Sequence, residues 1–233
     1  MLFSRLLQPL PSLCAVCRGW GDEAVCAACV ARYATPMPRC ERCALQVPEG
    51  VHTCGSCLKE PPPFDAACAG VDYAHPWSAL ITRFKFHEGL ELAHALVSPL
   101  ASALTRRGGP RPDLLLPVPL STERLRERGY NQGWEAARRL ARKTGLHADA
   151  TLLLRVKDSP HQLALPPDER AANVRDVFAV EPLRRAEVQG RSIAVVDDVL
   201  TTGATLAEIA RVLKQAGAVR VEAWALARTP RPG

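Results

Sequence analysis

The sequence predicts an α/β fold with a central, mostly parallel sheet, preceded by a small cysteine-rich module. Three observations lead to this prediction. The stretch 191–217 reads as a strand, a loop and a helix in succession; two more apolar strands are expected at 66–74 and 113–119; and eight of nine cysteines lie before residue 58. Strands that alternate with helical segments are typical of parallel sheets covered by helices. A chain of 233 residues has room for one ordinary domain and a small one.

The eight N-terminal cysteines form four Cys-x-x-Cys pairs: Cys14/Cys17, Cys26/Cys29, Cys40/Cys43 and Cys54/Cys57. Two sulfurs spaced in this way fit two corners of a tetrahedron around zinc, and two pairs complete a Cys₄ site. The simplest pairing makes one site from the first two pairs and one from the last two, although an interleaved pairing is also compatible with the spacing. A thioredoxin-like redox pair or an iron-sulfur cluster is the alternative, and redox use of one pair would not need the other three. Because a closed Cys₄ site has no open position, we expect structural zinc.

A stiff linker, Glu60-Pro-Pro-Pro63, follows the cysteines and predicts a domain boundary. We therefore expect a zinc-ribbon module over 1–62 and an α/β domain over 64–233. After the strand at 66–74, helices are predicted at 77–86 and 88–107. Lys85 lies among apolar neighbours on the first of them, and two interpretations stay open: a side chain that extends over a half-buried helix face, or a group near a bound phosphate.

A basic segment follows the apolar strand at 113–119. Arg124, Arg126 and Arg128 precede Gly129, and an Ala/Leu-rich helix then runs to about residue 143. The end of a parallel strand is where α/β sheets bind ligands, and arginine side chains suit the oxygens of a pyrophosphate. A run of charges on a solvated helix face is the alternative, and it applies most to Arg126.

The segment 155–178 is polar, interrupted by prolines and longer than an ordinary connection. We interpret it as a lid that keeps water away from a reactive centre. An exposed hairpin is the alternative.

The stretch 191–217 contains the most specific pattern of the chain. A β-branched strand over 192–196 leads to Asp197 and Asp198, a Thr/Gly loop at 201–205, and a helix that Thr205 and Glu208 would cap and Gly217 would end. Backbone N–H groups at such a helix start bind phosphate. Two carboxylates beside a phosphate need hydroxyls or a cation, so a ribose 5-phosphate with Mg²⁺ nearby satisfies both demands.

Two other interpretations of this stretch are a β-turn with solvated aspartates and a Walker B strand. The second needs a P-loop, and no G-x-x-x-x-G-K-[ST] occurs in the chain. The residues 195–205 resemble the phosphoribosyl pyrophosphate (PRPP) motif of type I phosphoribosyltransferases. The resemblance implies that fold for 64–233. We expect these residues to bind PRPP: Asp197, Asp198, Thr201, Thr202, Gly203, Ala204, Thr205, Arg124 and Arg128.

Motifs along nearly the whole chain resemble the ComF (ComFC/GntX-like) competence-protein family. They are the four cysteine pairs, Pro-Val-Pro before Arg124-x-x-x-Arg128-Gly-Tyr-Asn-Gln132, the PRPP motif, and Arg155, Gln162, Arg170 and Asn173. Tyr130 stands where the family is expected to have Phe. The resemblance implies a part in DNA uptake during natural transformation and the catalytic residues Asp197, Asp198 and Arg170. It leaves the acceptor open.

Composition limits the partners. The net charge is +6, and residues 104–145 hold ten Lys/Arg against four Asp/Glu, which favours an anionic ligand in the middle of the chain. No run of 18 apolar residues occurs, so we expect no membrane span. The proline-broken start is atypical of a signal peptide, so we expect a cytoplasmic protein.

Two functions remain: a phosphoribosyltransferase, or a non-catalytic PRPP-responsive adaptor that binds single-stranded DNA or DNA-uptake proteins. Only Trp20 and Tyr33 provide aromatic rings between Cys14 and Cys57, which weakens the DNA-binding version.

Overall fold

The structure is a computed structural model, and it describes residues 11–157 and 176–231. Its described elements, in chain order, are β1 (Ser12–Leu13), β2 (Trp20–Gly21), α1 (Ala27–Tyr33), α2 (Gly55–Lys59), β3 (Ala66–Asp72), α3 (Trp77–Phe86), the 3₁₀ turn η1 (Leu90–Leu92), α4 (Ala93–Arg107), β4 (Leu114–Pro117), α5 (Thr122–Arg128), α6 (Gln132–Thr144), β5 (His147–Ala148), β6 (Leu153–Arg155), β7 (Phe178–Val180), the 3₁₀ turn η3 (Pro182–Glu187), β8 (Ser192–Leu200), α8 (Ala204–Gln215) and β9 (Arg220–Arg228). No helix in the described ranges is long and apolar enough to cross a membrane.

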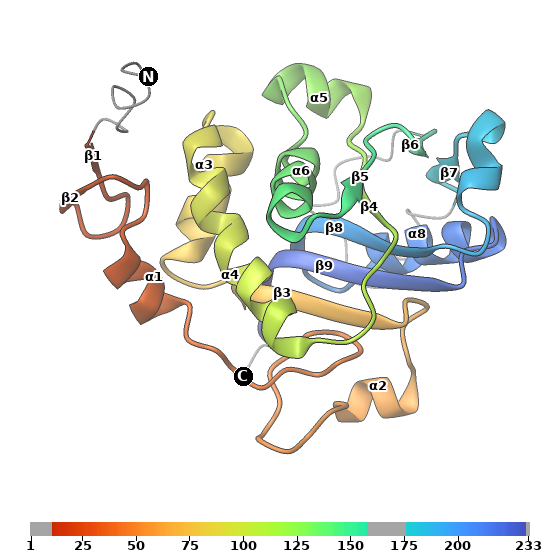
Figure 1. Ribbon diagram of the computed structural model, residues 1–233, viewed down its shortest axis with the longest axis horizontal. Helices are drawn as coiled ribbons and strands as arrows, with labels where there is room; N and C mark the ends of the chain where they lie inside the picture. The colour runs from red at the N-terminus through yellow and green to blue at the C-terminus, as the bar shows by residue number, and fades with distance from the viewer. Residues whose placement is uncertain (1–10, 158–175, 232–233) are drawn as a thin grey trace, which may run out of the picture.

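A five-stranded sheet with the order β3-β9-β8-β4-β5 forms the centre of the molecule (Figure 1). All four pairings in it are parallel. The chain leaves β4 toward one edge of the sheet, through α6 to β5, and leaves β8 toward the other edge, through α8 to β9. The order therefore reverses between β4 and β8, and such a switch point is where open α/β sheets bind ligands.

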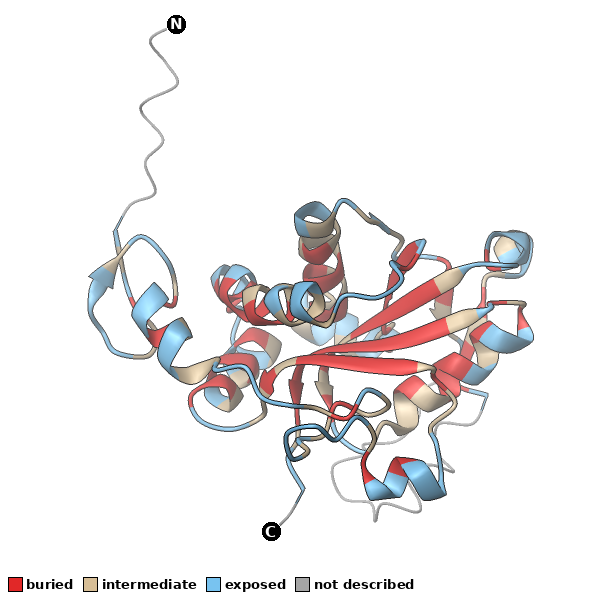
Figure 2. Ribbon diagram, turned by 60° about the horizontal axis from the view of Figure 1, so that its bottom comes forward, coloured by how far each residue is buried: buried red, intermediate tan, exposed pale blue. Residues whose placement is uncertain are grey.

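Helices cover both faces of the sheet. Apolar residues of α3, α4 and α6 pack on one face, and α8 with the antiparallel pair β6–β7 packs on the other. Figure 2 shows the strands as a buried layer between these partly exposed helices. Strand β8 serves both layers, since Ile193 and Val195 belong to one apolar cluster while Ala194 and Val196 belong to the other. This alternation also decides where the side chains at the end of β8 point.

The predicted elements agree with the structure in several places. The helix expected at 77–86 is α3, β3 and β4 lie inside the ranges expected for them, and α8 is followed by Gly217 at φ +102°. The helix expected from 88 begins later, at Ala93, because Glu88 adopts φ +51° and a 3₁₀ turn intervenes. The α/β architecture with a parallel central sheet is confirmed.

Three differences concern the region around the acidic motif. Strand β8 continues to Leu200, four residues past the predicted end, because it pairs with β9 along its whole length. Strand β9 itself was not anticipated, since its alanine-rich centre has no β-branched run. The capping box was wrong: Gly203 caps α8 without a side-chain hydrogen bond, and the Glu208 carboxylate accepts from the Asp176 N–H and from Arg211.

Candidate functional site

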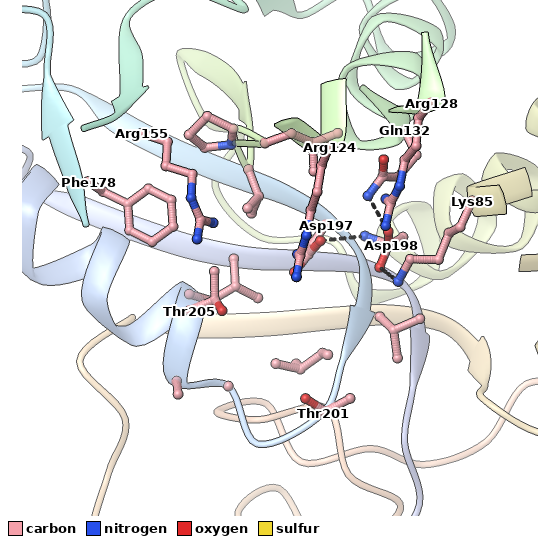
Figure 3. Close-up of a pocket in the computed structure, with 18 of the residues that line it drawn as sticks. Lys85, Arg124, Arg128, Gln132, Arg155, Phe178, Asp197, Asp198, Thr201 and Thr205 are labelled. Atoms are coloured by element: carbon pink, nitrogen blue, oxygen red, sulfur yellow. Dashed lines mark hydrogen bonds and ion pairs between the residues drawn. The ribbon is translucent and has the colours of Figure 1, made fainter. Parts of the chain in front are cut away.

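A cavity of about 340 Å³ opens at the carboxyl ends of β4 and β8, at the switch point of the sheet. Its walls come from α3, α5, the start of α6, the pair β6–β7, and the loop between β8 and α8. Figure 3 shows that the labelled side chains from these elements converge on this space. All nine residues expected to bind PRPP line it: Asp197, Asp198, Thr201, Thr202, Gly203, Ala204, Thr205, Arg124 and Arg128.

The two aspartates lie within β8, so the pleat of the strand separates their side chains. Asp198 has the parity of Ala194 and Val196, which face α4 and α6, and it is 4% exposed. Asp197 has the opposite parity and is half-buried. One strand end thus presents two carboxylates to different parts of the cavity wall.

Asp198 is held by two side chains from distant parts of the sequence. Lys85 Nζ from α3 lies 2.8 Å from one carboxylate oxygen, and Gln132 Nε2 from α6 donates to the other, also at 2.8 Å (Figure 3). Gln132 is positioned at the first turn of α6 by Asn131, whose side-chain oxygen accepts from the Trp134 N–H. Burial opposes the charge on Lys85, but the attraction of Asp198 outweighs it and raises the pKa of Lys85.

Asp197 has a different electrostatic environment. Its carboxylate accepts a hydrogen bond from the Asp198 N–H at 2.8 Å. Burial, together with repulsion by the Asp198 carboxylate, raises the pKa of Asp197 to about 7. The pair therefore holds one fixed carboxylate beside a second group that exchanges a proton near neutral pH.

The loop after β8 has the form of an anion-binding turn. Gly203 adopts φ +85°, a conformation that strains any residue with a Cβ, and this allows α8 to begin directly after the strand. The first intrahelical bond of α8 runs from Ala207 N to Gly203 O, at 2.8 Å. The N–H groups of Thr205 and Leu206 precede it in the helix, so they have no acceptor within α8 and face the cavity end.

The wall opposite the loop is basic. Arg124 and Arg128 extend from the short helix α5, which Ser121 caps by accepting from the Arg124 N–H at 3.2 Å. The Arg128 guanidinium lies over the Phe86 ring at 4.6 Å, which fixes its direction. Among the described residues, Arg128 Nη1 and Gln132 Oε1 are buried polar atoms without a hydrogen-bond partner. The unpaired Arg128 donor suits an anionic ligand, and the unpaired Gln132 acceptor suits a hydroxyl group.

The pair β6–β7 forms the third wall. Arg155 ends β6 and Phe178 begins β7, and both line the cavity, with the guanidinium 5.7 Å from the ring centre. The segment between them, which the sequence predicts to be a lid, falls mostly on residues 158–175 and lies outside the described residues. The same holds for Arg170, the third expected catalytic residue, and for Gln162 and Asn173 of the family pattern.

The cysteines gather into two clusters, one of Cys14, Cys17, Cys26 and Cys29 and one of Cys40, Cys43, Cys54 and Cys57. This is the simplest of the expected pairings. The Sγ atoms of Cys17 and Cys26 lie 3.8 Å apart, and those of Cys43 and Cys54 lie 3.7 Å apart. Four thiolates at about 2.3 Å from zinc would be about 3.8 Å from one another in a tetrahedron, so both donor sets fit this ion.

The ionisation of the thiols differs within each cluster. Burial disfavours the thiolate of Cys14, but backbone N–H groups outweigh it and lower the pKa of Cys14 to about 6, and similar contacts lower the pKa of Cys54 to about 7. Burial instead raises the pKa of Cys29 to about 12. A cluster in which some thiols ionise easily and others resist ionisation needs a bound cation to hold all four as thiolates.

Sequence reasoning identified the acidic and Thr/Gly parts of the cavity and missed part of its remaining wall. The sequence left two interpretations of Lys85 open, and its ion pair with Asp198 shows that its side chain lies at the cavity. Gln132 was noted only as part of a motif, without its role as the second partner of Asp198. Phe86 and Phe178 were not anticipated, because nothing in a single sequence separates them from core aromatic residues.

Comparisons with known proteins agree with this geometry. The family model of the phosphoribosyl transferase domain matches residues 152–232. The DNA utilization protein YhgH of Escherichia coli strain K12 is 34% identical over 227 residues, which cover 94% of this chain and 98% of that protein. Competence protein F of Haemophilus influenzae is 32% identical over 222 residues, with 92% and 96% covered.

Among solved structures, the adenine phosphoribosyltransferase of Leishmania tarentolae is similar over 70% of this chain and 76% of its own, at 16% identity and a TM-score of 0.38. That score supports no inference about the site. Fold, motif and family model together define a protein with a type I phosphoribosyltransferase-like α/β domain behind two four-cysteine clusters. On the identity and coverage of its curated relatives, the chain belongs to the ComF/YhgH competence protein family.

Proposed function

We propose that the chain binds PRPP in this cavity and transfers its ribose 5-phosphate to an acceptor, with release of pyrophosphate. One observation carries the proposal: a single cavity joins the Thr/Gly loop, the two aspartates and a set of cationic side chains, among them Lys85, Arg124 and Arg128. PRPP has one chemical group for each of these parts. These are a 5-phosphate, a pair of ribose hydroxyls, and a pyrophosphate that leaves from C1.

The 5-phosphate belongs in the loop. Backbone N–H groups meet the positive end of α8 there, and the small side chains of residues 201–205 allow a close approach. The ribose hydroxyls then lie along β8, where Asp197 and Asp198 accept hydrogen bonds from them. Asp198 offers a position already fixed by Lys85 and Gln132, so little of its motion remains to be lost on binding.

The pyrophosphate lies toward the basic wall. The buried Arg128 Nη1 without a partner provides a free donor for its oxygens, and Arg124 provides a second guanidinium. During transfer the bond between C1 and the pyrophosphate oxygen breaks, and a bond from C1 to the acceptor's nucleophilic atom forms. The negative charge that gathers on the leaving group is stabilised by the two arginines and Lys85.

We assign two metals within the same proposal. Mg²⁺, when bound with pyrophosphate, would neutralise part of the leaving charge. Asp197 would hold it, because its carboxylate accepts from the Asp198 N–H alone, whereas each oxygen of Asp198 already accepts from a side chain. The two cysteine clusters would hold structural zinc.

The names of the relatives refer to DNA utilization and competence, and we propose that this chain serves DNA uptake in the cytoplasm. The acceptor, a base, an amine or a nucleic-acid end, is left open.

The experiment that tests transfer is an assay of pyrophosphate release from PRPP, with and without DNA, on zinc-loaded protein. Asp198→Asn keeps the shape of the side chain but removes its charge, and we expect it to weaken PRPP binding by about tenfold to 100-fold. Asp113→Asn is the matched control: Asp113 accepts from the Ser192 N–H at the opposite end of β8, and its variant should bind like the wild type. Equal PRPP affinity in all three proteins would exclude the assignment.

A second candidate function is a non-catalytic adaptor that responds to PRPP and binds single-stranded DNA. One observation favours it: Trp20, in β2 between the two cysteine pairs of the first cluster, is 76% exposed, and an exposed ring of this size suits a stacked base. PRPP binding without pyrophosphate release, together with salt-dependent binding of an oligonucleotide that Trp20→Ala weakens, would support the adaptor. A transferase for small acceptors should show neither.

A further inference from the structure

Arg228, the last residue of β9, makes an unusual set of contacts beneath the loop of the cavity. It is 7% exposed, so its guanidinium is almost completely removed from water. Its Nη1 donates to three carbonyl oxygens, at 2.8 Å to Leu200, 2.5 Å to Thr201 and 2.8 Å to Thr229. Its Nε donates at 2.9 Å to the carbonyl oxygen of Cys43. One side chain therefore joins two places that are far apart in the sequence.

The first of these places is the start of the Thr/Gly loop. Leu200 ends β8 and Thr201 follows it into the turn at Gly203, so the directions of their carbonyl groups set the path of the loop. The ring of Phe64, which is 2% exposed, packs against the same turn; a Cβ on Gly203 would lie 3.8 Å from it. The loop is thus bonded to Arg228 and packs against Phe64.

The second place is the cysteine cluster of Cys40, Cys43, Cys54 and Cys57. Besides Cys43, its backbone is bonded to the edge strand of the sheet, where Ala67 N donates to Glu41 O at 2.7 Å. Arg231, just after β9, donates at 2.7 Å to Ser56 Oγ beside the last cysteine pair. In Figure 1 the segment 40–57 runs in orange beneath β3, close to the end of the chain.

We propose that Arg228 is a positioning residue that couples metal occupancy of the Cys40–Cys57 cluster to the order of the Thr/Gly loop, and through it to PRPP affinity. Only the last step of this inference, the effect on PRPP affinity, rests on the proposed function. When the metal holds Cys43 in place, the Cys43 carbonyl holds the guanidinium, and the guanidinium holds the carbonyls of Leu200 and Thr201. Residues 40–57 then belong with the cavity, although they precede the linker at 60–63.

The chemistry of arginine explains why this position suits it. A planar guanidinium donates in several fixed directions at once, which lets it bond to carbonyls of two segments, whereas a lysine ammonium is a compact point charge on a flexible stem. Three of the acceptors are backbone carbonyls at the ends of β8 and β9, where the hydrogen-bond ladder of the sheet stops. Replacement by lysine keeps the charge and loses the simultaneous contacts.

The first test compares Arg228→Lys with Arg220→Lys, the same change at the other end of β9. The Arg220 side chain donates to Glu222 of its own strand, and Arg220 is not among the described residues that line the cavity. We expect Arg228→Lys to raise the dissociation constant for PRPP about tenfold and Arg220→Lys to leave it within about twofold. Hydrogen exchange without PRPP should show faster exchange at Thr229 N–H and Ala207 N–H, which bond to Leu200 O and Gly203 O, in Arg228→Lys alone.

The second test keeps Arg228 and removes a metal ligand. Cys40 and Cys14 are both 0% exposed, and each sulfur accepts an N–H from the next pair in its cluster, so Cys40→Ser and Cys14→Ser are matched. Zinc content should fall by one site in each. We expect faster exchange at residues 200–207 and weaker PRPP binding only in Cys40→Ser. This arm also applies if Arg228→Lys does not fold.

Three outcomes decide the proposal. Faster exchange of the loop and weaker binding in Arg228→Lys and Cys40→Ser, but not in their controls, support it. Unchanged exchange of the loop in Cys40→Ser with its metal lost overturns it, and so do equal effects of Cys40→Ser and Cys14→Ser. If the wild type itself does not bind PRPP, the proposed function fails, while the exchange data still decide whether the cluster and the loop are coupled.

Discussion

The two cysteine clusters look alike in the sequence and in their sulfur geometry, yet they differ in what they touch. The first contacts the α/β domain through the end of α1, where Trp77 Nε1 donates to Tyr33 O at 2.7 Å and the Tyr33 ring meets His75 edge-on. This contact lies at the start of α3. The second is bonded to the edge strand of the sheet and, through Arg228, to the loop of the cavity.

This difference shows that the spacing of a metal-binding motif does not by itself determine which part of the protein the bound metal supports. Both clusters have the donor set of a closed structural site, and spacing alone predicts the same function for both. Their contacts separate them: the first meets the start of α3, whereas the second is bonded through Arg228 to the loop of the cavity. The predicted division into modules at 1–62 and 64–233 stays a prediction, and we propose that residues 40–57 act with the second part.

Stepwise removal of metal is expected to produce the largest difference between the two clusters. Cys17 of the first cluster is exposed, while Cys40, Cys54 and Cys57 of the second are buried, so a chelator should take the first metal sooner. We expect PRPP binding to survive release of the first metal and to be lost with the second. Metal release followed by a colorimetric chelator, with PRPP titrations at each stage, measures this order.

Restoring zinc is the control for that experiment. Binding should return when the second site is refilled, because the protein chain itself is unchanged. Loss of PRPP binding already at the first released metal would break the distinction between the two clusters.

A smaller effect is expected in the pH dependence of stability, which depends on the cavity and not on either cluster. The pKa of Asp197 is about 7 in the folded protein against an ordinary value of 3.8, so the folded state holds this proton more tightly than the unfolded state. The contribution to stability is therefore present below pH 4 and is lost as the pH rises to about 7. Asp197→Asn, which keeps the shape without the charge, should be more stable than the wild type at pH 8, by at most on the order of 4 kcal/mol.

Denaturant unfolding of the two proteins between pH 5.5 and pH 8 checks this sign. Both carry the same cysteine clusters, so any acid-induced loss of metal cancels in the difference between them. The advantage of Asp197→Asn should shrink toward the acid end. A constant difference across this range would contradict the assignment of a raised pKa to Asp197.

The smallest effect is expected where the first cluster meets α3. Trp77→Phe removes the indole hydrogen bond to Tyr33 O and some buried volume, and we expect it to lower the unfolding free energy by about 2 kcal/mol. Lys85 lies at the other end of the same helix, so this variant also tests whether a change at the start of α3 affects the cavity. PRPP affinity within about twofold of the wild type is the expected titration result. A clear loss of affinity would show that the first cluster, too, reaches the cavity.

The sequence was informative wherever the chemistry is local. A strand, two aspartates, a Thr/Gly loop and a helix lie within one short stretch, and the structure has them in that order around one cavity. The cysteine pairs combine as their spacing suggests. These features depend on neighbours in the chain, and the residue types alone indicate their geometry.

Contacts between distant segments could not be predicted in the same way. Gln132 meets Asp198 across 66 positions, and Lys85 meets it across 113. The capping box failed for the same reason, since the Glu208 carboxylate has a partner 32 positions away at Asp176. Arg228 is the extreme case: as the last residue of an unanticipated strand, it gave no local signal of the two segments that it joins.

The measurement that tests the central claim most directly is a calorimetric titration of the zinc-loaded protein with PRPP in the presence of Mg²⁺, repeated with ribose 5-phosphate as competitor. The account predicts saturable binding of one PRPP per chain, weakened by ribose 5-phosphate because both occupy the Thr/Gly loop and the aspartate pair. Absence of binding at millimolar PRPP, or binding that ribose 5-phosphate does not affect, would contradict it.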